Sequence, residues 1–213
     1  MQVVVNLRGD TVPKYGDYWT PMGVVRLSRA GWSSPFGLYD GAHERGTESR
    51  LSLAPAWEER GAGVRLADRA VDYGGVFLAI SIGPERADAV VTYAPVTGVG
   101  GPAFSMKLEI TPGGLLVRVT SANRDAFGLT LPVCIDDGRS RATIDQKKNW
   151  IRVGAGANSD SFEYVLIEGS RIARDGDGVS GGYGWLQPFR AETVDGQLVV
   201  QVRLLRVGEP ASN

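Results

Sequence analysis

Alternation of apolar and polar residues, and not a helical period, runs through most of this 213-residue chain. In the segment 198–204 the valines and leucines alternate with Gln201 and Arg203, and the segments 106–110 and 115–119 follow the same rule. A side-chain period of two with one apolar face is typical of a half-buried antiparallel strand. The chain must therefore fold mainly as antiparallel sheets.

Turn-forming residues separate the alternating segments, among a total of 29 glycines and 11 prolines. Strands are predicted at 2–7, 63–72, 76–82, 88–93, 104–111, 115–121, 128–135, 141–145, 149–153, 162–168, 170–174, 189–194 and 197–206. Gly74-Gly75 and Pro112-Gly113-Gly114 are expected to lie between strands, and Asp195-Gly196 predicts a hairpin because its favoured turn needs positive φ. Ala54 to Arg60 could form one or two helical turns with Ser52 as the cap.

A dozen or more short strands at regular spacing determine the expected fold class. We predict an all-β fold, a single two-sheet antiparallel β-sandwich of the jelly-roll or supersandwich type. No low-complexity linker divides the chain, so the sandwich should occupy 1–207 and leave 208–213 as a frayed tail.

Composition excludes several classes of function. The 23 basic and 24 acidic residues give a net charge of −1, which does not support a nonspecific grip on nucleic acid or on an anionic membrane. Cys134 is the single cysteine and His43 the single histidine, so disulfide frameworks, multi-cysteine metal sites and two-histidine zinc sites are excluded. Cys134 lies in an apolar run and is expected to be buried.

The sequence constrains the cellular location and the oligomeric state of the protein less than it constrains the fold. The composition is that of a folded soluble domain, and no apolar stretch approaches the length of a membrane span. The first residues lack the features of a signal peptide. We therefore expect a cytoplasmic protein or an excised domain of a secreted one. The oligomeric state stays open.

Aromatic residues concentrate between residues 15 and 39, which hold 6 of the 18 aromatics in the chain. Glycine, proline and serine interrupt the alternation there, so much of the segment should be loop. Loop aromatics either plug one end of a sandwich or form a platform on which the C–H faces of a sugar stack. The candidates for stacking are Tyr18, Trp19, Trp32 and Tyr39.

A polar segment, 40–50, follows directly. It is either a solvated loop or the rim of the aromatic platform. As a rim, Asp40, Arg45 and Glu48 would bind hydroxyl or carboxylate groups of a sugar. His43, Glu44 and Glu48 are the candidates for proton transfer.

Three further clusters have both a structural and a functional interpretation. Asp136 and Asp137 begin one turn, and Asp145, Lys147 and Trp150 surround another; both turns could belong to the same rim. In the segment 174–180, Asp175 and Asp177 alternate as in a calcium loop, but the segment lacks the bidentate glutamate of such a loop. A Ca²⁺ site here would rest on the alternation alone, and no other cofactor is expected. The next segment, 181–186, is glycine-rich and carries Tyr183 and Trp185, whose rings either extend a binding surface or cover a sheet end.

The residues from about 108 to 133 carry a resemblance to known proteins. Leu108–Asn123 reads as a strand, a tight turn at Pro112-Gly113-Gly114 and a second strand that ends near an asparagine; Phe127–Val133 then forms an apolar strand. This order resembles the β-sandwich domains of heparinase-type polysaccharide lyases and of galactose-mutarotase-like proteins. The resemblance implies a sandwich associated with carbohydrate processing. The mutarotase family's catalytic histidines have no counterpart here, because His43 precedes the similar region.

The sequence therefore favours a noncatalytic or accessory carbohydrate-recognition domain that binds an oligo- or polysaccharide through loop aromatics. One alternative is a polysaccharide lyase or hydrolase that uses His43 or a tyrosine for proton transfer and Arg45 for a uronate carboxylate. A second alternative is a structural or assembly domain whose exposed apolar surface meets another chain.

Overall fold

The computed structural model describes residues 1–7, 22–28, 52–59, 62–65, 73–95, 101–123, 126–136, 141–154, 160–181, 184–193 and 195–207. These residues form strands joined by turns. No helix occurs among the described residues, so none that could cross a membrane is found there.

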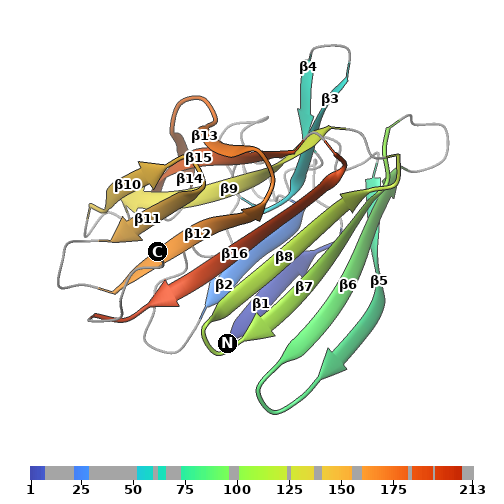
Figure 1. Cartoon of the computed structure of the whole chain (residues 1–213), viewed down its shortest axis with the longest axis horizontal. Helices are drawn as coiled ribbons and strands as arrows, with labels where there is room; N and C mark the ends of the chain where they lie inside the picture. The colour runs from blue at the N-terminus through green and yellow to red at the C-terminus, as the bar shows by residue number, and fades with distance from the viewer. Residues whose placement is uncertain are drawn as a thin grey trace, which may run out of the picture.

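In the described ranges, sixteen strands form three antiparallel sheets (Figure 1). The largest sheet contains β5 (Tyr73–Ile82), β6 (Ala87–Pro95), β7 (Phe104–Thr111), β8 (Gly114–Ser121), β10 (Thr143–Lys147), β11 (Trp150–Gly154), β12 (Ser161–Glu168) and β16 (Gln197–Leu205). The second contains β3 (Pro55–Glu59), β4 (Ala62–Arg65), β9 (Phe127–Asp136), β13 (Arg171–Arg174), β14 (Val179–Gly181) and β15 (Gly184–Thr193). The third is the ribbon of β1 (Gln2–Asn6) and β2 (Gly23–Ser28).

The eight-stranded sheet has the order β10-β11-β12-β16-β8-β7-β6-β5, and its register aligns apolar residues in rows across one face. One such row consists of Leu166, Val200, Val117, Leu108, Ala89 and Ile80. All of these side chains are buried except that of Ile80 at the edge strand β5. The alternation in the sequence thus produces one apolar face that is shared by eight strands.

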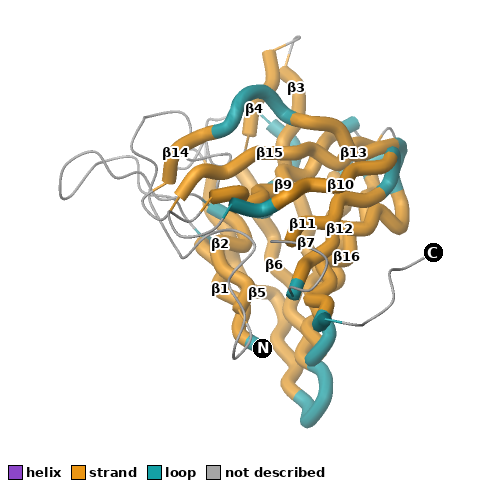
Figure 2. Tube along the Cα trace, turned by 90° about the vertical axis from the view of Figure 1, so that its left-hand side faces the viewer, coloured by secondary structure: helices purple, strands orange, loops and turns teal. Residues whose placement is uncertain are grey.

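The six-stranded sheet, in the order β13-β15-β9-β3-β4 with β14 paired to β15, and the β1–β2 ribbon pack on this apolar face. Figure 2 shows the layers from the side. Phe104 on β7 meets Phe127 on β9 edge to face, with ring centroids 5.4 Å apart. The Tyr93 hydroxyl on β6 donates to the Asn6 carbonyl of β1 at 2.9 Å. The predicted all-β antiparallel sandwich is confirmed, whereas the choice between jelly roll and supersandwich stays a prediction.

Several local predictions need correction. Asp195-Gly196 does not close a hairpin: β15 belongs to the six-stranded sheet and β16 to the eight-stranded one, so this turn crosses between layers. Gly74-Gly75 lies inside β5, where Gly75 allows the Tyr93 ring to approach the backbone. In place of a helical turn, Pro55–Glu59 is the strand β3, and the Ser52 hydroxyl donates to the Met22 carbonyl and caps nothing.

Two prolines face each other inside the six-stranded sheet, where proline is normally disfavoured because it cannot donate a ladder hydrogen bond. Pro132 on β9 pairs with Pro188 on β15. The Tyr164 hydroxyl donates to the Pro132 carbonyl at 2.6 Å, and the Asp175 amide donates to the Pro188 carbonyl at 3.0 Å. Both carbonyls therefore have partners from outside this pair of strands.

Candidate functional site

The structure describes the side chains of two tryptophans, Trp150 and Trp185. Trp185, at the start of β15, is the exposed one, with 46% of its surface accessible. It pairs with Ser180 of β14 on one side and with Asp136 of β9 on the other. A Cβ built at Gly178 would overlap the Nε1 and Cε2 atoms of the indole. The ring thus lies against the backbone of Gly178, while about half of the residue's surface stays open to solvent. We call Trp185 and Gly178 the Trp185 platform.

The loop beneath this ring is held by a buried amide. Gln187, 4% exposed, donates from Nε2 to the Gly176 carbonyl and to the Pro188 carbonyl, both at 3.1 Å. Gly176 has a φ of +73°, a left-handed conformation that glycine adopts without strain. Sequence reasoning missed Gln187, because nothing in the spacing shows that its side chain turns back toward the loop.

Oxygen-bearing side chains border the Trp185 platform. Asp177 precedes Gly178 and is exposed, as is Ser180, while Asp175 is half-buried. Carboxylate and hydroxyl oxygens next to an aromatic surface can accept or donate hydrogen bonds to the hydroxyls of a stacked sugar. Among the described residues no group of three or more histidine, cysteine or acidic side chains could hold a metal ion. The calcium interpretation of Asp175 and Asp177 stays a prediction.

The second tryptophan, Trp150, has a different environment. The Lys147 Nζ lies 5.1 Å from its ring centroid and the Arg152 Cζ lies 5.9 Å from it. Asp145 pairs with Arg152 across the β10–β11 hairpin. The hairpin register thus places Lys147 beside Trp150, and two cations cover the half-buried ring. A stacked sugar would have to displace them. A rim shared with the aromatic segment 15–39 stays a prediction.

The remaining candidates from the aromatic and polar segments lie outside the described residues. These are Tyr18, Trp19, Trp32, Tyr39, Asp40, His43, Glu44, Arg45 and Glu48. The tail at 208–213, Asp137 and Tyr183 also lie outside them. Cys134 is half-buried, not fully buried as expected, and packs beside Val179 and Leu186.

The described tyrosines Tyr73, Tyr93 and Tyr164 are fully buried. Burial raises the pKa values of Tyr93 and Tyr164. Their hydroxyls donate to backbone carbonyls of other segments, namely Pro102, Asn6 and Pro132. Within the described part of the chain, tyrosine thus serves the core and is out of reach of a substrate.

No protein-family model and no curated protein matches the sequence. Solved structures do match the fold. Heparan sulfate lyase HepC from Pedobacter heparinus aligns with a TM-score of 0.55 at 11% identity, over 85% of this chain and 29% of that one. Heparinase III aligns with a TM-score of 0.50 at 10% identity, over 84% of this chain and 28% of that one.

A third structure, the alpha-N-acetylgalactosaminidase NagBb from Bifidobacterium bifidum, aligns with a TM-score of 0.51 at 11% identity, over 74% of this chain and 31% of that one. The chain thus spans less than a third of each of these proteins. The resemblance drawn from residues 108–133, which form parts of β7, β8 and β9, is confirmed as a likeness of fold to heparinase-type lyases.

Proposed function

We propose that this chain is a carbohydrate-recognition β-sandwich domain and that the Trp185 platform is one of its sugar-stacking surfaces. The exposed indole seated on Gly178 carries the proposal. An apolar ring face with polar neighbours suits the alternating C–H and hydroxyl surface of a sugar. The likeness of fold to β-domains within a heparan sulfate lyase and a galactosaminidase supports a role near carbohydrates.

The charges near the Trp185 platform determine the expected sugar class. Asp177 is exposed beside Gly178, and Asp136 is the cross-strand partner of Trp185. Carboxylates accept hydrogen bonds from hydroxyls and repel a uronate or a sulfate group. We therefore expect neutral oligosaccharides to bind here more tightly than acidic ones. The loop aromatics Tyr18, Trp19, Trp32 and Tyr39, with Asp40 and Arg45, form the second proposed surface.

The test is a fluorescence titration of the wild-type chain with neutral and acidic oligosaccharides. A saturable change with a neutral sugar should be lost in Trp185→Ala, because the stacking surface is removed. Gly178→Ala should weaken binding by about tenfold, since the new methyl group lifts the indole from its support. Trp150→Ala is the control and should bind normally, because its ring is covered by Lys147 and Arg152.

Two outcomes would contradict these assignments. If no sugar in the panel gives a saturable change, carbohydrate recognition itself is wrong. If Trp185→Ala binds as the wild type does and Trp32→Ala does not, recognition belongs to the segment 15–39 and the Trp185 platform is not a binding surface.

The enzymatic alternative makes a separate prediction. A polysaccharide lyase or hydrolase that uses His43 and Arg45 should lose turnover in His43→Ala and still bind sugar. The observation that favours this alternative is the likeness of fold to heparan sulfate lyase. Unsaturated products, followed by ultraviolet absorbance, would indicate a lyase, and new reducing ends without unsaturation would indicate a hydrolase. Absence of both from the wild type would exclude this alternative.

A further inference from the structure

The strand β5 forms a free edge of the eight-stranded sheet, the last strand in its order. Its ten residues, Tyr73 to Ile82, include no charged side chain. Five of its apolar side chains are exposed by 42 to 82%, namely Val76, Phe77, Leu78, Ile80 and Ile82. Natural sheet edges usually carry charges or proline, or are covered, because an exposed edge pairs with other strands. Within the part of the chain that the structure describes, the edge has none of these protections over 76–82.

The backbone of this strand is set to accept another strand. The Gly83 amide donates to the Arg86 carbonyl at 2.8 Å and closes the β5–β6 turn. Alternation of an antiparallel ladder then points the N–H and C=O groups of Ile82 and Ile80 away from β6. Nearer the start of β5 an outward-pointing amide already has a partner within the chain, since the Gly75 amide donates to the Leu7 carbonyl at 2.9 Å.

The side chains at this edge continue the buried face of the sheet. Ile80 pairs with the buried Ala89, Phe77 pairs with Val91, and Ile82 pairs with Ala87. A register shift between Phe77 and Ala79 adds one residue, Leu78, to the strand. The apolar rows of the core therefore run out to β5, where the side chains of Phe77, Ile80 and Ile82 are exposed. In Figure 1 the β5–β6 hairpin projects at one end of the molecule.

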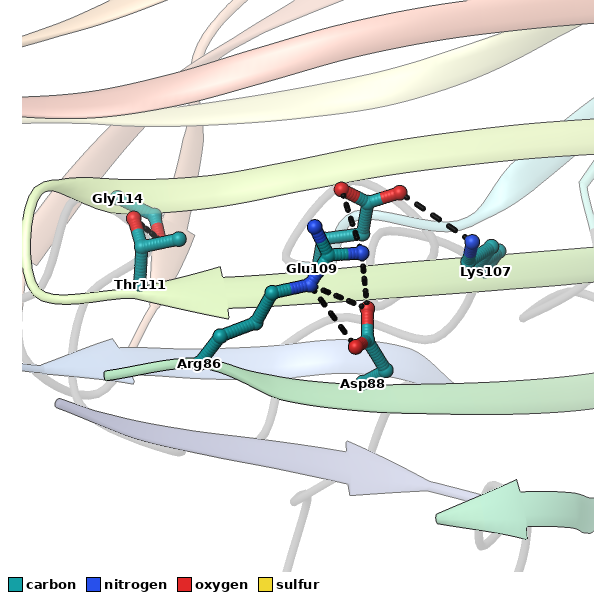
Figure 3. A network of polar contacts seen from close by, with 6 residues as sticks. All are labelled: Arg86, Asp88, Lys107, Glu109, Thr111 and Gly114. Atoms are coloured by element: carbon teal, nitrogen blue, oxygen red, sulfur yellow. Dashed lines mark hydrogen bonds and ion pairs between the residues drawn. The ribbon is translucent and has the colours of Figure 1, made fainter. Parts of the chain in front are cut away.

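Charges beside this edge are compensated within the chain, as Figure 3 shows. Arg86 donates to Asp88 at 2.7 Å and lies 3.1 Å from the Glu109 carboxylate, which also meets the Lys107 Nζ at 3.4 Å. These contacts lower the pKa of Asp88, chiefly through the hydrogen bond from Arg86. These four side chains carry two charges of each sign, so this cluster neither favours a partner of opposite charge nor repels an identical chain.

We propose that two copies of this chain associate through β5, antiparallel and edge to edge, so that their eight-stranded sheets become continuous. An uncharged strand is complementary to itself, and a two-fold pairing uses the same edge on both copies, so assembly stops at the dimer. The five exposed side chains present on the order of 500 Å² of apolar surface, a size typical of the largest patch on a monomer, which is often functional. Full burial of both patches and of the paired backbone would reach about 1,200 Å², the lower bound for a specific interface.

Light scattering coupled to size exclusion tests the proposal on the full chain. The wild type should reach twice the 22.8 kDa mass of one chain as its concentration rises. Ile80→Lys should weaken dimerisation at least ~10-fold, because it places two charges in the new strand pair. Ile167→Lys is the matched control: Ile167 is 58% exposed, close to the 60% of Ile80, but lies on β12, and this variant should dimerise as the wild type does.

Hydrogen exchange locates the contact. Amides of 76–82 should exchange more slowly at concentrations where the dimer forms, and Ile80→Lys should remove that difference. The proposal is wrong if the wild type stays monomeric up to its solubility limit. The same result would be found if the exposed side chains of β5 bound a different partner, and the proposal would be wrong in that case too. A dimer that survives Ile80→Lys and weakens in Ile167→Lys would also overturn it. Sugar binding is independent of both results, because Trp185 lies on the other sheet.

Discussion

At the scale of single residues, burial separates ion pairs that look equivalent in the sequence. Glu163 alternates with apolar residues on β12, so its period predicts a solvent-facing side chain, yet it is only 2% exposed. Arg152 on the neighbouring strand donates from Nε to its carboxylate at 2.7 Å. A buried carboxylate depends on such donors, because removal from water is costly for a charge. In the ion pair between Arg118 and Glu168, whose charged atoms lie 3.6 Å apart, both side chains are exposed to solvent.

Arg152→Met should therefore lower the free energy of unfolding by about 2–3 kcal/mol, since it removes a donor and leaves the buried Glu163 carboxylate. Arg118→Met is the matched control and should cost less than about 1 kcal/mol, because an exposed ion pair contributes little. Urea unfolding of both variants measures the difference. Equal losses would show that the burial of Glu163 has no energetic consequence.

At the scale of elements, the pairing of β9 with β15 depends on a side chain from the opposite layer. The Pro132–Pro188 pair supplies no N–H group to the ladder, and Tyr164 of the eight-stranded sheet satisfies the Pro132 carbonyl. Tyr164 is fully buried, which raises the pKa of its hydroxyl well above the ordinary value. This hydrogen bond thus links the two sheets at a point where one sheet cannot complete its own pattern.

Tyr164→Phe should destabilise the fold by about 1–2 kcal/mol, because a buried carbonyl loses its donor. The raised pKa adds a pH dependence: the unfolded tyrosine ionises near pH 10 and the folded one does not. Stability is therefore fully present below about pH 10 and declines as the pH rises toward the folded pKa. Chemical unfolding at pH 8 and above pH 10 should show a smaller decline in Tyr164→Phe than in the wild type. An unchanged decline would contradict the assignment.

At the scale of the whole molecule, one apolar core joins all three sheets. Phe104 and Phe127 meet across the layers, and the β1–β2 ribbon contributes Val24 and Leu27 to the same core. Because the Asp195-Gly196 turn passes from one layer to the other, neither sheet is a separate segment of sequence. The described sheets should therefore unfold together.

Phe127→Ala should lower the free energy of unfolding by about 3–5 kcal/mol, because it opens a cavity between layers. The transition should remain single, with fluorescence and far-ultraviolet circular dichroism changing together. Ile167→Ala, at an exposed position, should cost less than about 0.5 kcal/mol. Two separated transitions in the variant would show that the sheets are independent.

The alternation of apolar and polar residues by itself predicted the strands of the eight-stranded sheet and the β7–β8 turn at Pro112-Gly113-Gly114, because a side-chain period of two is a local property. It did not predict β14, or β3, where the sequence favours a helical turn. It also indicated the likeness to heparinase-type sandwiches through residues 108–133. Trp185 could be named from the sequence as a possible binding ring beside a glycine-rich turn.

Only the tertiary structure decided which strands are neighbours. A turn such as Asp195-Gly196 reverses the chain in the same way whether the next strand pairs in the same sheet or crosses to the other layer, so its sequence cannot distinguish the two. For the same reason the exposure of Trp185 and of β5 could not be predicted: both depend on which distant segments cover them. Burial is the sum of long-range contacts, and these are established only when the layers pack.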